Sequence, residues 1–154
     1  MSGYVIEFQN VNMVFGKKAI LKDVSFTVSK GETLAVIGPS GSGISTILRL
    51  LIGLLEPTEG KILINGQDVS QFDEDHWNVL RQKMGMVFQY SALFDFLTVG
   101  ENVAFGLRQH TELSEAEIQK IVAERLEQVG LPGTQAAYPA ELSGGKKKRV
   151  SLAR

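Results

Sequence analysis

The fold of this chain is decided by residues 38–46, which read Gly38-Pro39-Ser40-Gly41-Ser42-Gly43-Ile44-Ser45-Thr46. This stretch meets the phosphate-binding pattern G-x-x-x-x-G-K-[ST] at every fixed position except Ile44, which stands where the pattern has lysine. The apolar segment 33–37 before it predicts a buried strand, and the apolar segment 45–55 after it predicts a helix. A strand, a glycine-rich loop and a helix in this order are typical of a phosphate-binding P-loop. A merely flexible Gly/Ser turn would not need these flanking segments.

The chemistry of this loop has a backbone part and a side-chain part. Glycines at 38, 41 and 43 let backbone N–H groups approach phosphate oxygens, and the first turn of the following helix adds more N–H groups. Ser45 is placed to offer its hydroxyl to Mg²⁺. Ile44 removes the ammonium group that would reach the β- and γ-phosphates, a loss of about 2–5 kcal/mol. The sequence therefore predicts weak ATP binding and defective hydrolysis, since hydrolysis depends on stabilising phosphoryl charge.

Composition places the chain among globular proteins. It has 154 residues, of which 44% are hydrophobic and 21% charged, enough for a domain with a real core. A net charge of −1 gives no electrostatic case for nucleic acid or an anionic membrane. The absence of cysteine excludes disulfides and thiolate metal sites and fits a reducing cytoplasm. The N-terminus does not resemble a signal peptide, and the apolar segment 46–55 is too short to span a bilayer. These features favour a cytoplasmic or peripheral protein.

The remaining patterns predict a β-rich first third and a helical second half. Asn65-Gly66 is a strong hairpin signal, and Ser114 with Glu117 forms a capping box. That box opens a helix whose apolar stripe is explained by core packing and which stops at Gly130. We expect strands at 4–8, 24–28, 61–64 and 85–88, and further helices at 73–82, 98–107 and 146–154.

A second motif follows the predicted helices. Residues 142–145 read Leu142-Ser143-Gly144-Gly145, and Gln89 ends a predicted strand between this motif and the P-loop. Together these elements resemble the nucleotide-binding subunit of ABC transporters over the whole chain. The resemblance implies an α/β fold of the P-loop NTPase (ABC-type) class, with an antiparallel β subdomain, a partial RecA-like core and a helical subdomain. The implied divisions are 1–89 (β subdomain and P-loop part of the core), 90–145 (helical subdomain with signature) and 146–154 (the start of the return to the core).

The same resemblance implies roles for single residues. Phe15 is similar to the aromatic residue on which adenine stacks, and residues Gly38 to Thr46 would hold the phosphates. Ser45 and Gln89 would contact Mg²⁺, with Gln89 also a candidate contact of the attacking water. Two subunits of such transporters face head to tail, so Ser143, Gly144 and Gly145 would bind in trans the ATP held by a second subunit, identical or not.

Finer likenesses concern the branch and the partners. The segments 88–95, 101–105, 107–111 and 138–142 are similar to the Mla-type branch, whose ATPases energise phospholipid movement between bacterial membranes. The implied partners are a second ATP-binding subunit and a transmembrane permease, on which the helical subdomain docks. Membrane contact would come only through the permease, on the inner face of the cell membrane. No nucleic-acid partner is expected.

Three features depart from the family pattern. Ile44 replaces the P-loop lysine, and Lys146 stands where glutamine or methionine is usual. The run from Lys146 to Arg149 is interpreted as a solvated helix face rather than a nucleic-acid site. The sequence ends at Arg154, before the strand that carries the family's catalytic carboxylates, so no complete catalytic set is expected. We therefore expect a chain that is defective in hydrolysis and, with its core strands unpaired, poorly folded alone.

Two readings of the function stay open. In the first, the chain is the ATP-binding subunit of a transporter and couples ATP binding and hydrolysis to transport, with its own hydrolysis impaired. In the second, it is a non-catalytic degenerate subunit or fragment that acts only as an interaction module. A nucleotide kinase or GTPase is disfavoured by residues 142–145.

Overall fold

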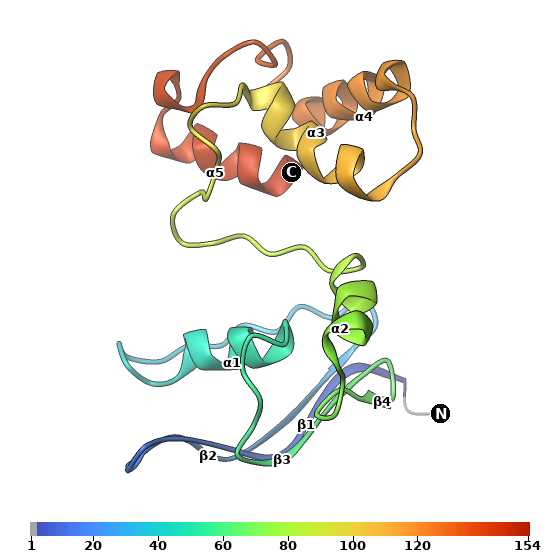
Figure 1. Cartoon of the computed structure of the whole chain (residues 1–154). Helices are drawn as coiled ribbons and strands as arrows, with labels where there is room; N and C mark the ends of the chain where they lie inside the picture. Colours follow the sequence, from blue (N-terminus) through green and yellow to red (C-terminus); the bar gives the residue numbers. More distant parts are fainter. Residues whose placement is uncertain (1–2) are drawn as a thin grey trace. The chain divides into compact units, whose positions relative to one another are not determined.

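Alternating apolar residues in the first half of the chain build a four-stranded antiparallel sheet (Figure 1). In this computed structural model, which describes residues 3–154, the strands lie in the order β2-β1-β3-β4. Their bounds are β1 Tyr4–Phe15, β2 Lys18–Ser29, β3 Glu59–Ile64 and β4 Gln67–Asp68. The hairpin predicted at Asn65-Gly66 joins β3 to β4, and both of its residues have positive φ.

The first two strands are much longer than the predicted segments 4–8 and 24–28. Register shifts near Asn10 and Asp23, which have φ of 50° and 49°, interrupt the pairing without ending it. The Asn10 side-chain amide donates to the Asp23 carboxylate across the irregularity at 2.7 Å. Sequence alternation is lost at such bulges, so the pattern alone underestimates the strands.

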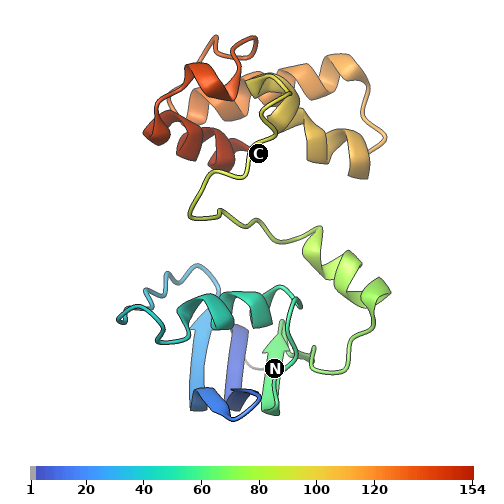
Figure 2. The same ribbon diagram turned by 60° about the vertical axis from the view of Figure 1, so that its left-hand side comes forward.

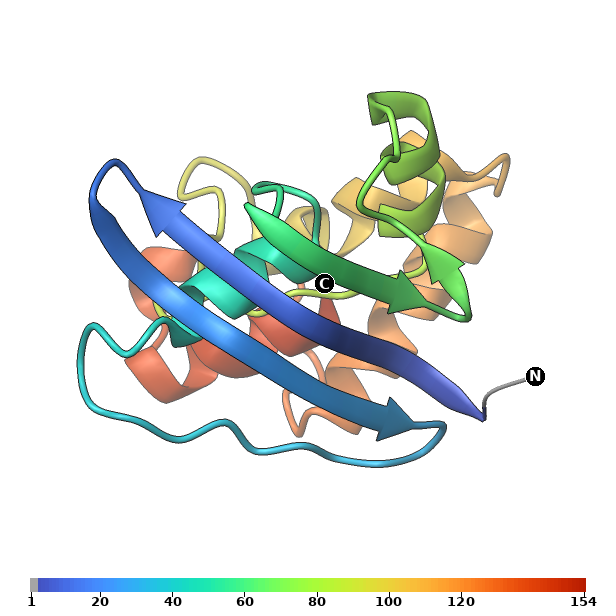
Figure 3. The same ribbon diagram turned by 90° about the horizontal axis from the view of Figure 1, so that it is seen from below.

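Helix α1, Ile44–Leu51, lies across one face of this sheet (Figures 2 and 3). Ile47 and Leu50 are its buried residues, and they pack with strand residues such as Phe8 and Ile62. Helix α2, Glu74–Arg81, begins after the N-cap Asp73, as predicted for 73–82, and adds Trp77 to the same core. The buried core of this part is Phe8, Val11, Met13, Leu21, Ile47, Leu50, Ile62, Ile64, Val69 and Trp77.

Helix α1 ends earlier than the predicted segment 45–55. The Leu54 N–H donates to the Arg49 carbonyl at 2.9 Å and the Gly53 N–H donates to the Leu50 carbonyl at 3.2 Å, a Schellman ending. Gly53 takes φ of 69°, and its α-carbon lies so close to the Trp77 ring that a Cβ would be 2.3 Å from it. Gly53 therefore ends the helix, and its lack of a side chain lets the Trp77 ring pack against it.

Two predicted strands are absent. Residues 33–37 and 85–88 are extended but irregular, and neither pairs with another strand in the part of the chain that the structure describes. Most of their apolar side chains are exposed, with Leu34 at 43% and Ile37 at 92% of full exposure, while Met86 is half-buried. The prediction of a buried strand at 33–37 is therefore wrong for this chain, because an apolar run becomes a strand only where a neighbour accepts and donates its backbone hydrogen bonds.

The chain divides into two units, Met1–Met84 and Gly85–Arg154. The second contains α3 (Val99–His110), α4 (Glu115–Gln128), a short 3₁₀ turn η1 (Pro139–Glu141) and α5 (Gly144–Ala153). The capping box of Ser114 and Glu117 is confirmed, and Thr98 with Glu101 forms another at the start of α3. α5 begins two residues before the predicted 146. The three helices share a core of Val99, Val103, Ala104, Ile118, Val122, Leu126, Leu131, Val150 and Ala153.

Candidate functional site

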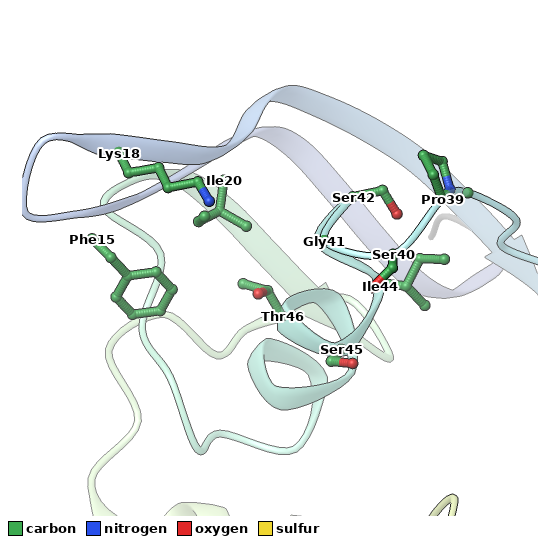
Figure 4. Close-up of a pocket in the computed structure, with 12 residues that line it drawn as sticks. Phe15, Lys18, Ile20, Pro39, Ser40, Gly41, Ser42, Ile44, Ser45 and Thr46 are labelled. Atoms are coloured by element: carbon green, nitrogen blue, oxygen red, sulfur yellow. The ribbon is translucent and has the colours of Figure 1, made fainter.

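A cleft of about 470 Å³ opens between the turn that joins β1 to β2 and the loop that precedes α1 (Figure 4). It is lined by ten of the residues that the sequence singled out, together with two that it did not, Lys18 and Ile20. The ten are Phe15, Gly38, Pro39, Ser40, Gly41, Ser42, Gly43, Ile44, Ser45 and Thr46. The fold thus brings the predicted aromatic residue and the whole predicted P-loop to one cleft.

Close packing requires glycine at two loop positions. A Cβ on Gly43, whose φ is 96°, would lie 2.7 Å from Leu21 Cδ2 and 3.3 Å from the Ile20 carbonyl oxygen. A Cβ on Gly38 would lie 2.6 Å from Ser42 Oγ. The Ser42 N–H donates to the Pro39 carbonyl at 3.1 Å, which closes the loop on itself. These contacts press the loop against β2 and fix its backbone at the head of α1.

The first turn of α1 is suited to an anion. Its N-cap is Gly43, no side chain in the described part caps it, and no acidic residue occupies the first turn. The first N–H groups of a helix have no acceptor within the helix, and the helix dipole adds partial positive charge there. This differs from α2, α3 and α4, whose first turns carry acidic side chains and a side-chain cap.

Ile44 supplies no polar group to this turn. It is half-buried, and its Cδ1 lies 3.6 Å from the place where a Cβ on Gly38 would stand, so the side chain packs against the start of the loop. Ser45 is exposed and its hydroxyl lines the cleft next to Thr46 (Figure 4). Position 44 therefore brings no cation to the first turn of α1.

A magnesium ion would find few protein ligands here. No group of three or more His, Asp or Glu residues that could hold a metal occurs within residues 3–154, and no carboxylate lines the cleft. Mg²⁺ commonly keeps one or two protein ligands and completes its shell with phosphates and water. The Ser45 hydroxyl fits that role together with a bound nucleotide.

The other predicted site residues lie in the second unit. Gln89 is exposed and follows the irregular segment 85–88, so it does not end a strand as predicted. Ser143 is the N-cap of α5, with Oγ 3.5 Å from the Lys146 N–H, and Gly144 and Gly145 open the helix on an exposed surface. A Cβ on either glycine would meet nothing within 4 Å, so their backbone is accessible.

The basic run at 146–149 is not wholly a solvated face. Lys148 Nζ donates to the carbonyl oxygens of Phe88 and Gln89, each at 2.6 Å. Arg149 Nη1 donates to the carbonyls of Val129 and Gly130 just after α4, at 3.2 and 3.3 Å. Two of the four cations therefore satisfy backbone carbonyls, which corrects the interpretation of this run.

Comparison with known proteins agrees with this geometry. Residues 21–154 match the sequence profile described as ABC transporter. The chain belongs to the ABC transporter family. A solved dimer of the ATP-binding cassette MJ0796, in a post-hydrolysis state bound to ADP and Pi, matches with a TM-score of 0.85 and 33% identity over 96% of this chain and 67% of that one. The expected fold class, an ABC-type P-loop NTPase, is confirmed.

The chain is similar in sequence to several curated proteins. The chain is 46% identical over 153 residues to TRIGALACTOSYLDIACYLGLYCEROL 3 of Arabidopsis thaliana, covering 99% of this chain and 44% of that protein. It is 42% identical over 154 residues to the intermembrane phospholipid transport system ATP-binding protein MlaF of Haemophilus influenzae, covering 100% and 58%. A sulfate/thiosulfate import ATP-binding protein, CysA 1 of Agrobacterium fabrum, is 41% identical over 152 residues, covering 97% and 42%. The chain spans about half the length of these curated relatives.

One further property bears on the membrane. Among residues 3–154, no helix is both long enough and apolar enough to cross a bilayer.

Proposed function

We propose that this chain binds ATP in the cleft between Phe15 and the loop 38–46, as part of the ATP-binding subunit of an ABC transporter. The observation that carries the proposal is that the aromatic residue and the glycine loop, separated by more than twenty residues in sequence, line one cleft. Adenine would stack on Phe15, which is half-exposed, and the phosphates would receive N–H groups of the loop and of the first turn of α1. Ser45 would bind Mg²⁺ through its hydroxyl.

Hydrolysis by this chain is proposed to be defective. Ile44 places an apolar side chain where charge on the transferring phosphoryl group needs a cation, and no carboxylate lines the cleft to orient water. Gln89 remains a candidate contact of the metal or the water, but its side-chain amide carries no charge and cannot replace a carboxylate. Binding without normal turnover is the outcome that these residues favour.

A second subunit is part of the proposal. The exposed N–H groups of Gly144 and Gly145 at the start of α5, with the hydroxyl of Ser143, offer a second anion site. This site belongs to the unit Gly85–Arg154, whereas the loop 38–46 belongs to the unit Met1–Met84. Bound in trans, these groups would contact the ATP held by a second, head-to-tail subunit. The dimeric state of the MJ0796 cassette supports this arrangement.

The transported substrate is proposed to be phospholipid. MlaF is named for intermembrane phospholipid transport, and the Mla-like segments such as 88–95 lie in the helical unit. The 41% identity to a sulfate/thiosulfate importer shows that identity over this part of the protein does not by itself select a substrate. We place the chain on the cytoplasmic face of the membrane, in contact with a transmembrane permease.

An interaction module without catalysis is the second candidate. Its support is the exposure of two aromatic side chains in the unit Gly85–Arg154, Tyr90 at 83% and Phe96 at 76%, which leaves both rings open to a partner. The two candidates differ in whether the cleft must hold nucleotide.

The test is a titration of the chain with Mg-ATP, followed by calorimetry, for the wild type and for Ile44→Lys and Ile44→Met. Ile44→Lys should tighten binding about 30-fold, which corresponds to about 2 kcal/mol. This is the lower end of the range for restoring a charged partner, because water screens charge at an exposed loop. Methionine has a similar length without charge and should leave the affinity near that of the wild type. Equal affinities for the lysine and methionine variants would refute the electrostatic role of position 44, and no binding by any of the three would refute the nucleotide site.

A further inference from the structure

The cleft contains a cation that the P-loop pattern does not include. Of the residues that line it, Lys18 alone carries a charged side chain. Lys18 is exposed at the start of β2, and Figure 4 shows its side chain running toward Ile20, along the cleft wall rather than away from it. No carboxylate lines the cleft to neutralise it.

The position of Lys18 along the cleft follows from strand geometry. Lys18 pairs with Phe15 across the hairpin, so it starts beside the proposed base platform. Ile20, two residues further along β2, lines the same cleft and contacts the loop, since a Cβ on Gly43 would lie 3.2 Å from Ile20 Cγ2. Two residues of a strand span about 7 Å. The flexible four-carbon stem of Lys18 can therefore extend along the cleft from the aromatic ring toward the glycine loop.

We propose that Lys18 supplies the side-chain positive charge for the α- and β-phosphates of the nucleotide, in a cleft where Ile44 supplies none. The inference rests on the proposed nucleotide site. The α- and β-phosphates are the ones nearest the nucleoside, and Lys18 approaches from the side of Phe15. Lys18 thus takes over part of the electrostatic role of the missing P-loop lysine, from β2 and from the opposite side of the phosphates.

This placement has a consequence that the P-loop lysine would not share. ADP and ATP both carry the α- and β-phosphates, so Lys18 should contribute equally to the affinity of each. A lysine at position 44 would reach the β- and γ-phosphates and favour ATP over ADP. The ratio of the two affinities therefore separates the two cations.

The test measures ADP and Mg-ATP binding to the 154-residue chain with Lys18→Gln, Lys18→Arg and Lys17→Gln. Lys17 is the matched control, because it is an adjacent exposed lysine that does not line the cleft. Lys18→Gln should weaken both nucleotides about fivefold, the range of an exposed ion pair. Lys18→Arg should stay within about twofold of the wild type, since it keeps the charge, and Lys17→Gln should have no effect.

The other outcomes separate the role of Lys18 from the proposed nucleotide site. If the wild type binds nucleotide and Lys18→Gln binds as tightly, Lys18 has no role and the proposed function stands. An equal loss in Lys17→Gln would mean that only net charge matters, and a loss confined to ATP would place the contact at the γ-phosphate, so both refute the assignment. If the wild type binds neither nucleotide, the proposed function fails and this inference fails with it.

Discussion

Replacing Asn102 with alanine is expected to destabilise the unit Gly85–Arg154 strongly without disturbing the sheet. Asn102 is the one fully buried polar side chain among the described residues, at 0% exposure, and it lies in α3. Its Oδ1 accepts from the Phe94 N–H at 2.8 Å. Its Nδ2 lies 3.1, 3.2 and 2.9 Å from the carbonyl oxygens of Phe94, Leu97 and Thr98. This side chain therefore ties the turn before α3 to the helix.

The magnitude follows from the number of bonds. An amide has two N–H hydrogens, so the three carbonyl contacts represent two donated bonds, to which the accepted bond is added. At about 1 kcal/mol for each net hydrogen bond, alanine removes about 3 kcal/mol, and more if the released backbone groups stay dry. A single core as small as this one supplies about 3–5 kcal/mol. The variant should therefore lose most of the free energy of unfolding of this unit.

Urea unfolding with two probes measures the effect. The only tryptophan, Trp77, lies in the unit Met1–Met84, so its fluorescence reports that unit. Far-UV circular dichroism is dominated by α3, α4 and α5 of the other unit. The Asn102→Ala variant should lose helical signal at low urea while the Trp77 response stays that of the wild type. Asn78→Ala, at an exposed position in α2, is the control and should change stability by less than about 0.5 kcal/mol.

Two results would refute this reasoning. An Asn102→Ala chain whose helical signal melts at the wild-type urea concentration would show that the four contacts contribute little. A parallel shift of the Trp77 fluorescence would contradict the assignment of Asn102 to one independently stable unit.

Two further predictions concern acid and exposed apolar surface. Hydrogen bonds from Arg108, and then from Gln119, hold the pKa of Glu115 at about 2, below its ordinary 4.5, so this contact stabilises the fold above pH 4.5 and is lost as the pH falls toward 2. Glu115→Gln should lower the melting temperature at pH 7 but not at pH 2, whereas Glu112→Gln, in the loop before α4, should match the wild type at both; a deficit that persists at pH 2 would exclude the charge as its cause. The expectation that the chain folds poorly alone concerns 33–37, where Ile37 is 92% exposed. Ile37→Ser should reduce dye binding to apolar surface and slow aggregation measured by light scattering, and unchanged aggregation would point to another segment.

Local signals account for what the sequence predicted well. Helix starts depend on side chains within four residues, and so Asp73, Ser114 and Ser143 mark the N-caps of α2, α4 and α5. The P-loop pattern is likewise local, since its residues are consecutive and the turn brings Gly38 against Ser42, whereas the contact of Gly43 with β2 appears only in the fold. The aromatic residue came from a family resemblance, and the cleft shared by Phe15 and the loop is a property of the fold.

Long-range pairing accounts for what the sequence predicted badly. Whether 33–37 forms a strand depends on a neighbour elsewhere in the protein, and hydrophobicity carries no information about that neighbour. Lys18 was missed for a similar reason, because an exposed lysine at a hairpin is ordinary until the fold sets the loop beside it. The pairing of β1 with β2 shifts register between Ala19 and Leu21, so a period of two in the sequence does not predict that Lys18 and Ile20 line one cleft.

The segment around Gln89 shows how a helix can replace the missing strand pairing. Lys148, Ser151 and Arg154 follow one another at intervals of three along α5 and so lie on one side of it. Each donates to backbone carbonyls of the segment 88–92, which are those of Phe88, Gln89, Ser91 and Ala92. Ala92 takes φ of 48°, a conformation that an L residue adopts only when its surroundings hold it. Of these carbonyls, only that of Phe88 belongs to the predicted strand 85–88. The side chains of α5 satisfy it together with the carbonyls that follow, and they fix the backbone of Gln89 to the helix whose N-cap is Ser143.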